Sequence, residues 1–399
     1  MSKVSILMPT YNDSNFIRQS LESIIAQTFK NYEILICNDG STDDTEQIIK
    51  EYMKEKDKEG KIKYYYEDNA DQLNAIIKLI PHITGEYIYI LHSDDLLYDE
   101  NTLEKMVLYM DNNKNVSSII SDIVTIDEKN NLLKTNKIIN YKNKNSNDII
   151  ALQLLWLGRN LFVDMAFHRK EVFVKNVYKN YLLWNGPFWL NLDENNILNI
   201  QKVDFPFFKY RVGDNNYLNN DISKLNVING EIRIVTRLLY NYDIPYYKFQ
   251  YITFRILNKL KLSNKFKPIY KNKETESQNK YNIVKFVLNK RFSDEEIEKN
   301  SYLNALLMFY KNYKKRSIEI SLKDVKIYYG KDMRQFNKKI VNNDIETKYK
   351  EIFAEMKKGF NEIIVEKSEY EKMIDITKFL CIYPYAKVSI RKEVQNGKK

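Results

Sequence analysis

Short apolar runs alternate with segments of helical periodicity along the first 110 residues. The runs are short enough for buried strands, and the segments between them repeat apolar residues every three or four positions. We expect strands at 4–8, 32–37, 62–66 and 87–91, and helices at about 16–25, 42–55, 71–80 and 102–111. Helices between short strands require crossover connections, so the pattern predicts an α/β fold with a mostly parallel sheet and helices on both faces. Ser14 or Asn15, and Ser41 or Thr42, are the expected helix caps.

Polar clusters follow three of the four expected strands. These clusters are Pro9–Asn12, Asn38–Ser41 and His92–Asp95. Because parallel strands end at one edge of a sheet, where ligands commonly bind, we expect the clusters to form one site. Asp94 and Asp95 offer the oxygen ligands that Mg²⁺ or Mn²⁺ prefers. Taken alone, an Asp pair after a strand is more often a turn or a helix cap, and the other two clusters favour the site.

The chemistry of these clusters suits a nucleotide. The Asp39 carboxylate can accept a hydrogen bond from a pyrimidine N–H, and groups around Thr10 can hold a ribose. A cation on the acidic pair would neutralise a diphosphate. Neither a Gly-x-Gly-x-x-Gly turn after the first strand nor a P-loop occurs. The phosphates are therefore expected to meet a cation.

Composition indicates a globular protein with two unlike parts. With 399 residues, 44% of them hydrophobic and 29% charged, the chain is long enough for two domains. Residues 1–110 carry 11 Lys and Arg against 20 Asp and Glu, whereas the whole chain has a net charge of +10. The basic remainder could meet anionic lipid, a phosphorylated acceptor or nucleic acid, or it could reflect compositional drift. Cys37 and Cys381, the two cysteines of the sequence, argue against a disulfide framework or a cysteine-rich zinc site.

The C-terminal half shows helical periodicity. We expect one domain at 1–218 and a basic, mainly α-helical domain at 219–399, with a possible linker near 264–280. Ser293–Glu296 reads as a capping box before a helix that reaches Lys315. A membrane span and a signal peptide are not expected, which favours the cytoplasm, with peripheral contact at the inner face of the membrane as a further possibility. Nucleic acid is not an expected partner, because no recognition motif occurs.

The ordered motifs resemble a known family. Val4–Asn12, Asn38–Asp43 and Gly85–Asp95 are together similar to the family 2 inverting glycosyltransferases of GT-A fold, strongly over about 3–110 and more weakly to about 218. Phe167–Phe173 and Pro206–Val212 carry the weaker part. The resemblance implies a nucleotide-sugar site, which we assign to Pro9, Thr10, Tyr11, Asn12, Asp39, Asn69, Gln72, His92, Ser93 and Asp94.

Two departures from the family pattern matter. His92 stands where the Asp-x-Asp metal motif commonly begins, so Asp94 is the best expected metal ligand and Asp95 the next. The family's general base aligns with Asn185, and an amide cannot take a proton at physiological pH. Asp164 or Asp193 could serve instead, the acceptor could need no strong base, catalysis could be lost, or the alignment could be out of register there.

These observations define the expected activity. The resemblance implies a metal-dependent hexosyl- or N-acetylhexosaminyl-transferase that uses Mn²⁺ or Mg²⁺ and a nucleotide-sugar, expected to be a UDP-sugar. The acceptor would be a hydroxyl of a glycan, a lipid-linked glycan or a protein, and this hydroxyl would attack the anomeric carbon of the donor with inversion. The candidate catalytic residues are Asp94, Asp95, Asn185, Asp193 and Asp164, with Trp184, Trp189 and Arg211 on the acceptor side. The alternatives are a nucleotidyltransferase and a nucleotide-sugar-binding protein that has lost its base.

Overall fold

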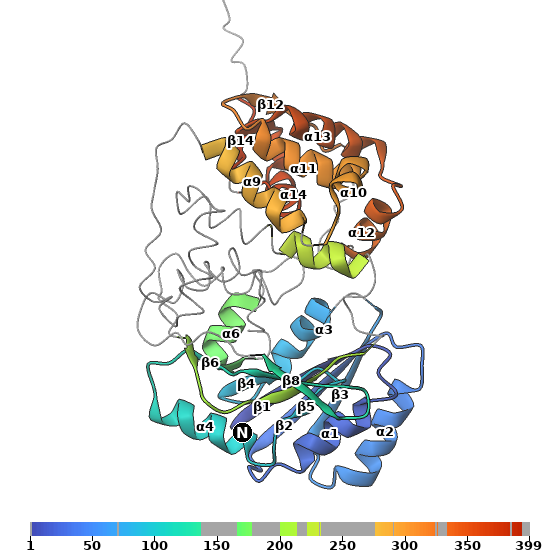
Figure 1. Cartoon of the computed structure of the whole chain (residues 1–399), viewed down its shortest axis with the longest axis vertical. Helices are drawn as coiled ribbons and strands as arrows, with labels where there is room; N and C mark the ends of the chain where they lie inside the picture. Colours follow the sequence, from blue (N-terminus) through green and yellow to red (C-terminus); the bar gives the residue numbers. More distant parts are fainter. Residues whose placement is uncertain are drawn as a thin grey trace, which may run out of the picture. The chain divides into compact units, whose positions relative to one another are not determined.

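The computed structural model describes most of both halves of the chain. The described residues are 2–69, 72–136, 166–177, 200–213, 222–230, 232, 276–289, 291–323, 325, 333–383 and 385–392. The chain divides into two compact units, and the described residues of the first end at Gly213 while those of the second begin at Ile222 (Figure 1).

The first unit contains two sheets and the helices around them. Its strands are β1 (Val4–Thr10), β2 (Tyr32–Asp39), β3 (Ile62–Glu67), β4 (Tyr87–Ile90), β5 (Leu96–Leu97), β6 (Ser118–Ile120), β7 (Ile123–Ile126), β8 (Leu132–Asn136), β9 (Phe167–Arg169), β10 (Ile200–Lys202) and β11 (Phe208–Arg211). Its helices are α1 (Ile17–Ile25), α2 (Thr45–Lys56), α3 (Gln72–Leu79), α4 (Thr102–Asn112) and α6 (Lys170–Val177). All four strands and four helices expected before residue 112 are present, with ends shifted by at most a few residues.

The larger sheet has seven strands in the order β10-β6-β9-β4-β1-β2-β3. The strands β4, β1, β2 and β3 are mutually parallel, and β9 runs antiparallel to both of its neighbours. Figure 1 shows α1, α2 and α4 on one face of this sheet and α3 and α6 on the other. The predicted α/β class, with a mostly parallel sheet covered on both faces, is confirmed.

Burial on both faces explains why the strands read as continuous apolar runs. Every residue of β1 and β2 is buried, as is every residue of β4. A parallel sheet that is covered by helices on both faces needs such runs, because neither face meets water. The apolar side chains of α1, among them Ile17, Leu21 and Ile24, complete the core on one side.

A second, smaller sheet was not predicted. It has the order β5-β11-β7-β8, with β11 parallel to β7 and antiparallel to β5. β5 follows the acidic pair directly, and β11 ends at Arg211. The paired strands β5 and β11 are far apart in the sequence, so hydrophobic periodicity could not reveal their pairing. This sheet brings residues 208–213 to the end of β4.

The expected caps of the first two helices are wrong. The residue before α1 is Phe16, and no side chain caps that helix; instead the Asp13 carbonyl accepts hydrogen bonds from the N–H groups of Phe16 and Ile17. Asp44 precedes α2, and its side chain forms no capping bond either. Ser14 and Ser41 therefore lie in the loops after β1 and β2 and do not cap a helix.

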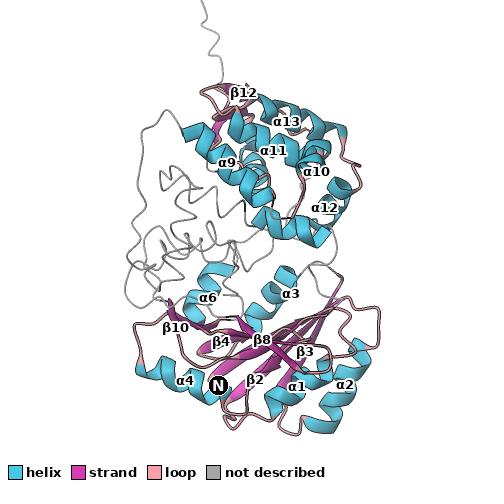
Figure 2. Cartoon of the chain, viewed as in Figure 1, coloured by secondary structure: helices cyan, strands magenta, loops and turns pink. Residues whose placement is uncertain are grey.

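The second unit is mainly helical, as predicted, but it also holds a small sheet (Figure 2). Its elements are a helix at 222–230, α9 (Glu276–Leu288), α10 (Asp294–Lys299), α11 (Ser301–Lys311), β12 (Ser317–Glu319), α12 (Met333–Val341), α13 (Thr347–Lys358), β13 (Glu362–Val365), α14 (Tyr370–Phe379) and β14 (Lys387–Ile390). The strands form a parallel sheet in the order β12-β13-β14. Three short strands between helices give too weak a periodic signal to be separated from the helical pattern around them.

The capping box at Ser293 is confirmed, but the helix after it is interrupted. The Ser293 and Glu296 side chains each bind the backbone N–H of the other residue. Asn300 then accepts hydrogen bonds from Tyr302 and Leu303 and begins α11 as a separate helix. Part of the expected linker, 264–275, lies outside the described residues, and α9 begins at Glu276 within it.

Among the described residues, no helix is long and apolar enough to cross a membrane. The expected cytoplasmic location stays a prediction.

Candidate nucleotide and cation site

The three polar clusters meet at one edge of the seven-stranded sheet. β1 pairs with β2 up to Thr10 and Asn38, and β4 lies on the other side of β1. The loops after β1 and β2 are bonded to each other, because the Asn12 N–H donates to Ser41 Oγ at 3.0 Å and Asn12 Oδ1 accepts from the Thr42 N–H at 2.8 Å. Asn12 has a φ of 56°, a left-handed conformation in which Asn is more common than most residues. The predicted convergence is confirmed.

The loops after β2 and β3 form the side expected to hold the nucleotide. Asp39 is 3% exposed at the end of β2. Gly40 follows with a φ of +71°, and a Cβ there would lie 2.6 Å from the backbone nitrogen of Asn69. Glycine is therefore required where these two loops touch. Gln72 begins α3, and its Nε2 lies 2.9 Å from Nε2 of His92.

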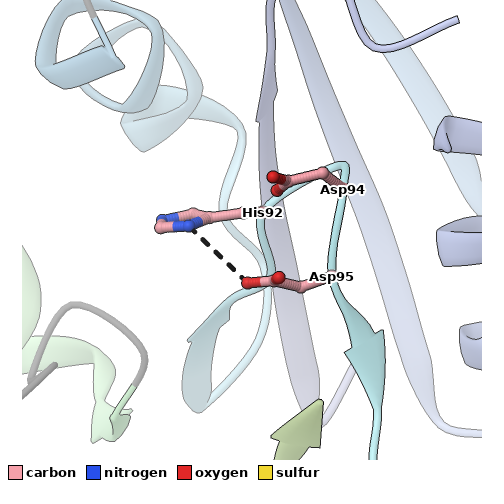
Figure 3. Close-up of side chains that lie close together, drawn as sticks. All are labelled: His92, Asp94 and Asp95. Carbon is pink, nitrogen blue, oxygen red and sulfur yellow. Dashed lines mark ion pairs between the residues drawn. The ribbon is translucent and has the colours of Figure 1, made fainter. Parts of the chain in front are cut away.

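The loop after β4 holds the acidic pair. Ligand atoms of His92, Asp94 and Asp95 all lie within 4.8 Å of one another. Asp95 is fully buried, and its Oδ2 lies 3.8 Å from Nδ1 of His92, as the dashed line in Figure 3 marks. The Asp94 carboxylate is not part of this ion pair (Figure 3). The two neighbouring carboxylates therefore have different surroundings.

Arg211, at the end of β11, holds this loop in place. Its backbone N–H donates to Asp95 Oδ1 at 2.8 Å, and its Nε donates to the Asp94 carbonyl at 2.7 Å. The rest of the guanidinium donates to the carbonyls of Asp127 and Glu128 and to Gln19 Oε1, and stacks 4.5 Å from the Phe16 ring. Arg211 is 1% exposed. Its expected contact with the acceptor stays a prediction.

Burial and mutual repulsion dominate the electrostatics of the acidic pair. Burial raises the pKa of Asp94, and the nearby charge of Arg211 lowers it only in part. Burial also raises the pKa of Asp95 well above its usual value, and the negative charge of Asp94 adds to the effect. Carboxylates that share a site in this way are stabilised as anions by a cation between or beside them.

Asp13 is a site residue that sequence reasoning missed. Its Oδ2 accepts hydrogen bonds from Ser93 Oγ, from Thr10 Oγ1 at 3.3 Å and from the Tyr11 N–H at 3.3 Å. Burial and, after it, the charge of Asp94 raise the pKa of Asp13 to about 7. The sequence does carry a signal for it, because Asp13 directly follows the polar cluster Pro9–Asn12 after the first strand.

A pocket of about 360 Å³ opens beside Asp94. It is lined by Tyr11, Asn12, Asp13, Asn15, Phe16, Asp94, Glu128, Arg211 and Gly213. Tyr11, which lines it, is 41% exposed. The pocket thus combines carboxylates, amides, rings and a guanidinium from the segments that follow β1, β4 and β7 and from the end of β11.

Several of the predicted residues cannot be placed in this site. Asp164, Asn185, Asp193, Trp184 and Trp189 lie outside the described residues. The general base and most of the acceptor side therefore stay predictions. The structure does bring together Pro9, Thr10, Tyr11, Asn12, Asp39, Asn69, Gln72, His92, Ser93, Asp94, Asp95 and Arg211 along one edge of the first unit.

The residues at the end of β4 fit a hard divalent cation. Two carboxylates and an imidazole stand close enough to share one ion. Asp95 Oδ2 is buried and forms no hydrogen bond with any residue that the structure describes. A buried carboxylate oxygen without a hydrogen bond is costly, and a cation would offset that cost.

Comparison with known proteins places these features in a family. The sequence-family model described as Glycosyl transferase family 2 matches residues 5–176 of the chain. An uncharacterized glycosyltransferase of Methanocaldococcus jannaschii is 31% identical over 221 residues, which cover 54% of this chain and 73% of that protein. An uncharacterized glycosyltransferase of Rickettsia bellii is 37% identical over 134 residues, which cover 34% of this chain and 19% of that protein. For a Rickettsia typhi relative, 35% identical over 153 residues, the shares are 38% and 46%.

The chain thus spans well under two thirds of the Rickettsia relatives that it matches. Among solved structures, Staphylococcus aureus TarS residues 1–349 with UDP-GlcNAc has 16% identity and a TM-score of 0.49, over 86% of this chain and 92% of that one. A likeness of that size bears on neither the fold nor the activity. The match over most of the Methanocaldococcus protein does bear on descent, and by it the chain belongs to glycosyl transferase family 2.

Proposed function

We propose that the chain transfers a sugar from a nucleotide-sugar to an acceptor hydroxyl, with inversion, in a reaction that depends on Mn²⁺ or Mg²⁺. The donor is a UDP-sugar, and the transferred group is a hexose or an N-acetylhexosamine. The acceptor is a hydroxyl of a glycan, a lipid-linked glycan or a protein. Family membership supports the reaction class, and the residues at the sheet edge support the donor and the cation.

The position of Asp94 carries this proposal. Its carboxylate lines a pocket at the carboxyl edge of a parallel sheet, beside the exposed ring of Tyr11. This edge is where open α/β sheets bind ligands. The raised pKa of Asp94, and the Asp95 oxygen that has no hydrogen bond among the described residues, both indicate carboxylates that a bound cation would stabilise.

The end of β2 supports a pyrimidine base. Asp39 is an acceptor-only group when ionised, so it suits the N–H of uracil. The contact between Gly40 and Asn69 brings the loop after β3 next to it, and Gln72 connects the same side to His92. A nucleotide could therefore extend from Asp39 to Asp94 along the edge formed by β2, β1 and β4.

The reaction places opposite charges on the two parts of the donor. Displacement at the anomeric carbon leaves negative charge on the departing diphosphate, and a bound divalent cation supplies the positive charge that stabilises it. The role of Asp94 is to hold that cation at the edge of the sheet. Arg211 holds the Asp94 backbone, so the carboxylate is positioned before the donor binds.

The test is the release of nucleoside diphosphate from a panel of UDP-sugars and GDP-sugars, with Mn²⁺, with Mg²⁺ and with a chelator. We expect one UDP-sugar to be cleaved in the presence of a cation, and the Asp94→Asn variant to lose this activity. Glu100→Gln is the matched control, because it removes an exposed carboxylate from the same segment.

The outcomes separate the candidate functions. Cation-independent cleavage that persists in Asp94→Asn would contradict the proposed cation site. Binding of UDP without cleavage of any donor, even with mixed glycan acceptors, would favour the nucleotide-sugar-binding protein that Asn185 at the base position keeps open. Incorporation of a nucleotide rather than a sugar would favour the nucleotidyltransferase.

A further inference from the structure

The pocket beside Asp94 contains a carboxylate from a different strand end. Asp13, in the loop after β1, and Asp94, in the loop after β4, both line it. His92 and Asp95, the neighbours of Asp94 in the acidic motif, do not. Glu128, in the loop after β7, lines it as well, so the carboxylate residues around this space come from the ends of three strands and not from one motif.

Asp13 is held in a defined position by one of its two oxygens. Oδ2 accepts hydrogen bonds from Ser93 Oγ, Thr10 Oγ1 and the Tyr11 N–H. No hydrogen bond to Oδ1 is found among the residues that the structure describes. The Asp13 N–H also donates to Thr45 Oγ1 at 2.9 Å, so the backbone is secured as well. The second oxygen remains available for a ligand.

The acidic motif alone offers the pocket little negative charge. His92 stands first and carries no negative charge, and its Nε2 lies against Gln72. Asp95 is fully buried, with Oδ1 on the Arg211 N–H and Oδ2 turned toward His92. Of the two aspartates in the motif, Asp94 is the one that lines the pocket. A divalent cation that also binds a diphosphate is usually held by one or two carboxylates.

We propose that Asp13 supplies the second carboxylate of the cation site, so that the cation is held between the ends of β1 and β4. This inference rests on the proposed cation-dependent function. Ser93 precedes Asp94 in the chain and donates a hydrogen bond to Asp13. This bond therefore fixes the position of Asp13 relative to Asp94. Asp13 would thus provide the negative charge that His92, at the first position of the motif, does not.

This arrangement connects the cation to the nucleotide side. Asp13 accepts a hydrogen bond from the N–H of Tyr11, whose ring stands at the edge of the pocket. A cation on Asp13 would therefore hold the loop that contacts the nucleotide, and each ligand should strengthen the binding of the other. The coupling between the two ligands gives a readout that is independent of catalysis.

The experiment measures Mn²⁺ binding by electron paramagnetic resonance, with and without saturating UDP, for the full chain and for Asp13→Asn. The substitution removes the charge but keeps an oxygen for the Ser93, Thr10 and Tyr11 donors. We expect the affinity for Mn²⁺ to fall by about 10–100-fold. The increase in affinity that UDP produces in the unmodified protein should shrink as well.

Asp43→Asn is the matched control. Asp43 accepts hydrogen bonds from the Ser14 N–H at 3.1 Å and from Thr45, so it supports the same loop, but it does not line the pocket. We expect its affinity for Mn²⁺ to stay within about threefold of the unmodified protein, because Asp43 does not line the pocket and its oxygens already accept hydrogen bonds from Ser14 and Thr45. Thermal unfolding of each variant checks that it is folded.

Four results would count against the inference, and one of them would count against the proposed function as well. Asp13→Asn with unchanged affinity, beside Asp94→Asn that no longer binds Mn²⁺, would show Asp13 to be a loop anchor and leave the proposed function standing. Equal losses in Asp13→Asn and Asp43→Asn would assign the effect to the loop. No Mn²⁺ binding by the unmodified protein, even with UDP, would overturn both proposals. If Asp13→Asn does not fold, Ser93→Ala replaces it, and unchanged affinity there would likewise overturn the inference.

Discussion

The buried carboxylates at the two ends of the seven-stranded sheet differ in how fully they are hydrogen-bonded. At the amino end, Glu33 of β2 is 3% exposed and accepts hydrogen bonds from Ser5 Oγ, the Thr84 N–H, Thr84 Oγ1 and Lys63 Nζ at 2.6–2.7 Å. At the carboxyl end, Asp95 is fully buried, and one of its oxygens has no hydrogen bond among the described residues.

The pKa values follow this difference. Burial alone would raise the pKa of Glu33, but the hydrogen bonds from Lys63, Ser5 and Thr84 outweigh it and hold the pKa below its usual value. Burial raises the pKa values of Asp94 and Asp95, and their hydrogen bonds do not compensate. A buried acid that the protein satisfies stabilises the fold, whereas one that it leaves unsatisfied indicates a place for a ligand.

The largest effect expected at the carboxyl end is the loss of function without loss of stability. Asp94→Asn should lower cation-dependent nucleotide release by about 10²–10³-fold, because the charge that holds the cation is gone. Without cation, its free energy of unfolding should not fall and should rise by about 1 kcal/mol, since the repulsion from Asp13 and Asp95 is relieved. Activity assays and thermal unfolding check the two parts, and a destabilised variant would contradict the comparison.

A pair of arginines sharpens the contrast between the two ends. Arg211 donates to the Asp94 carbonyl, whereas Arg169 of β9 donates to the carbonyls of Val116, Met110 and Asn113, away from the site. Lysine cannot reproduce either fork, so Arg211→Lys and Arg169→Lys should each lower the free energy of unfolding by about 2–4 kcal/mol. Urea denaturation measures this loss. Mn²⁺ affinity should fall in Arg211→Lys and stay unchanged in Arg169→Lys; equal affinities would remove the positioning role of Arg211.

Glu33→Gln should show the reverse of Asp94→Asn. The amide brings a donor toward groups that already donate, so the free energy of unfolding at pH 7 should fall by about 1–3 kcal/mol. Mn²⁺ affinity and nucleotide release should not change in the fraction that is folded. Denaturant titration and the binding assay test this, and a weakened cation site would mean that the two ends are not independent.

The smallest effect is the pH dependence of that same variant. Glu33 has a lower pKa in the folded protein than the usual value of about 4.5 for a glutamate, so it contributes stability above that value. This contribution is lost as the pH falls through the lower folded pKa. The difference in unfolding free energy between the unmodified protein and Glu33→Gln should therefore be largest at neutral pH and shrink in acid. A difference that is independent of pH would assign it to packing.

The elements around the sheet were predictable because their cause is local. Continuous apolar runs and helical periodicity identified β1 to β4 and α1 to α4, since a sheet buried on both faces needs those runs. The pairing of β11 with β5 and β7, and the strands β12 to β14, were missed. These pairings join segments distant in sequence or too short for a periodic signal.

The sequence by itself determined the family and the order of the first four strands and helices, because each depends on local motifs and local periodicity. It also predicted the convergence of the three polar clusters, because parallel strands end at one edge of a sheet. Only the tertiary structure decided which carboxylates face the pocket. The turn after β4 buries Asp95 fully and places Asp94 at the pocket, Arg211 comes from a strand more than a hundred residues away, and Ser93 donates a hydrogen bond to Asp13 from another loop. The charge and solvation of an acid depend on everything packed around it, and that environment is assembled by folding and is not written in any one segment.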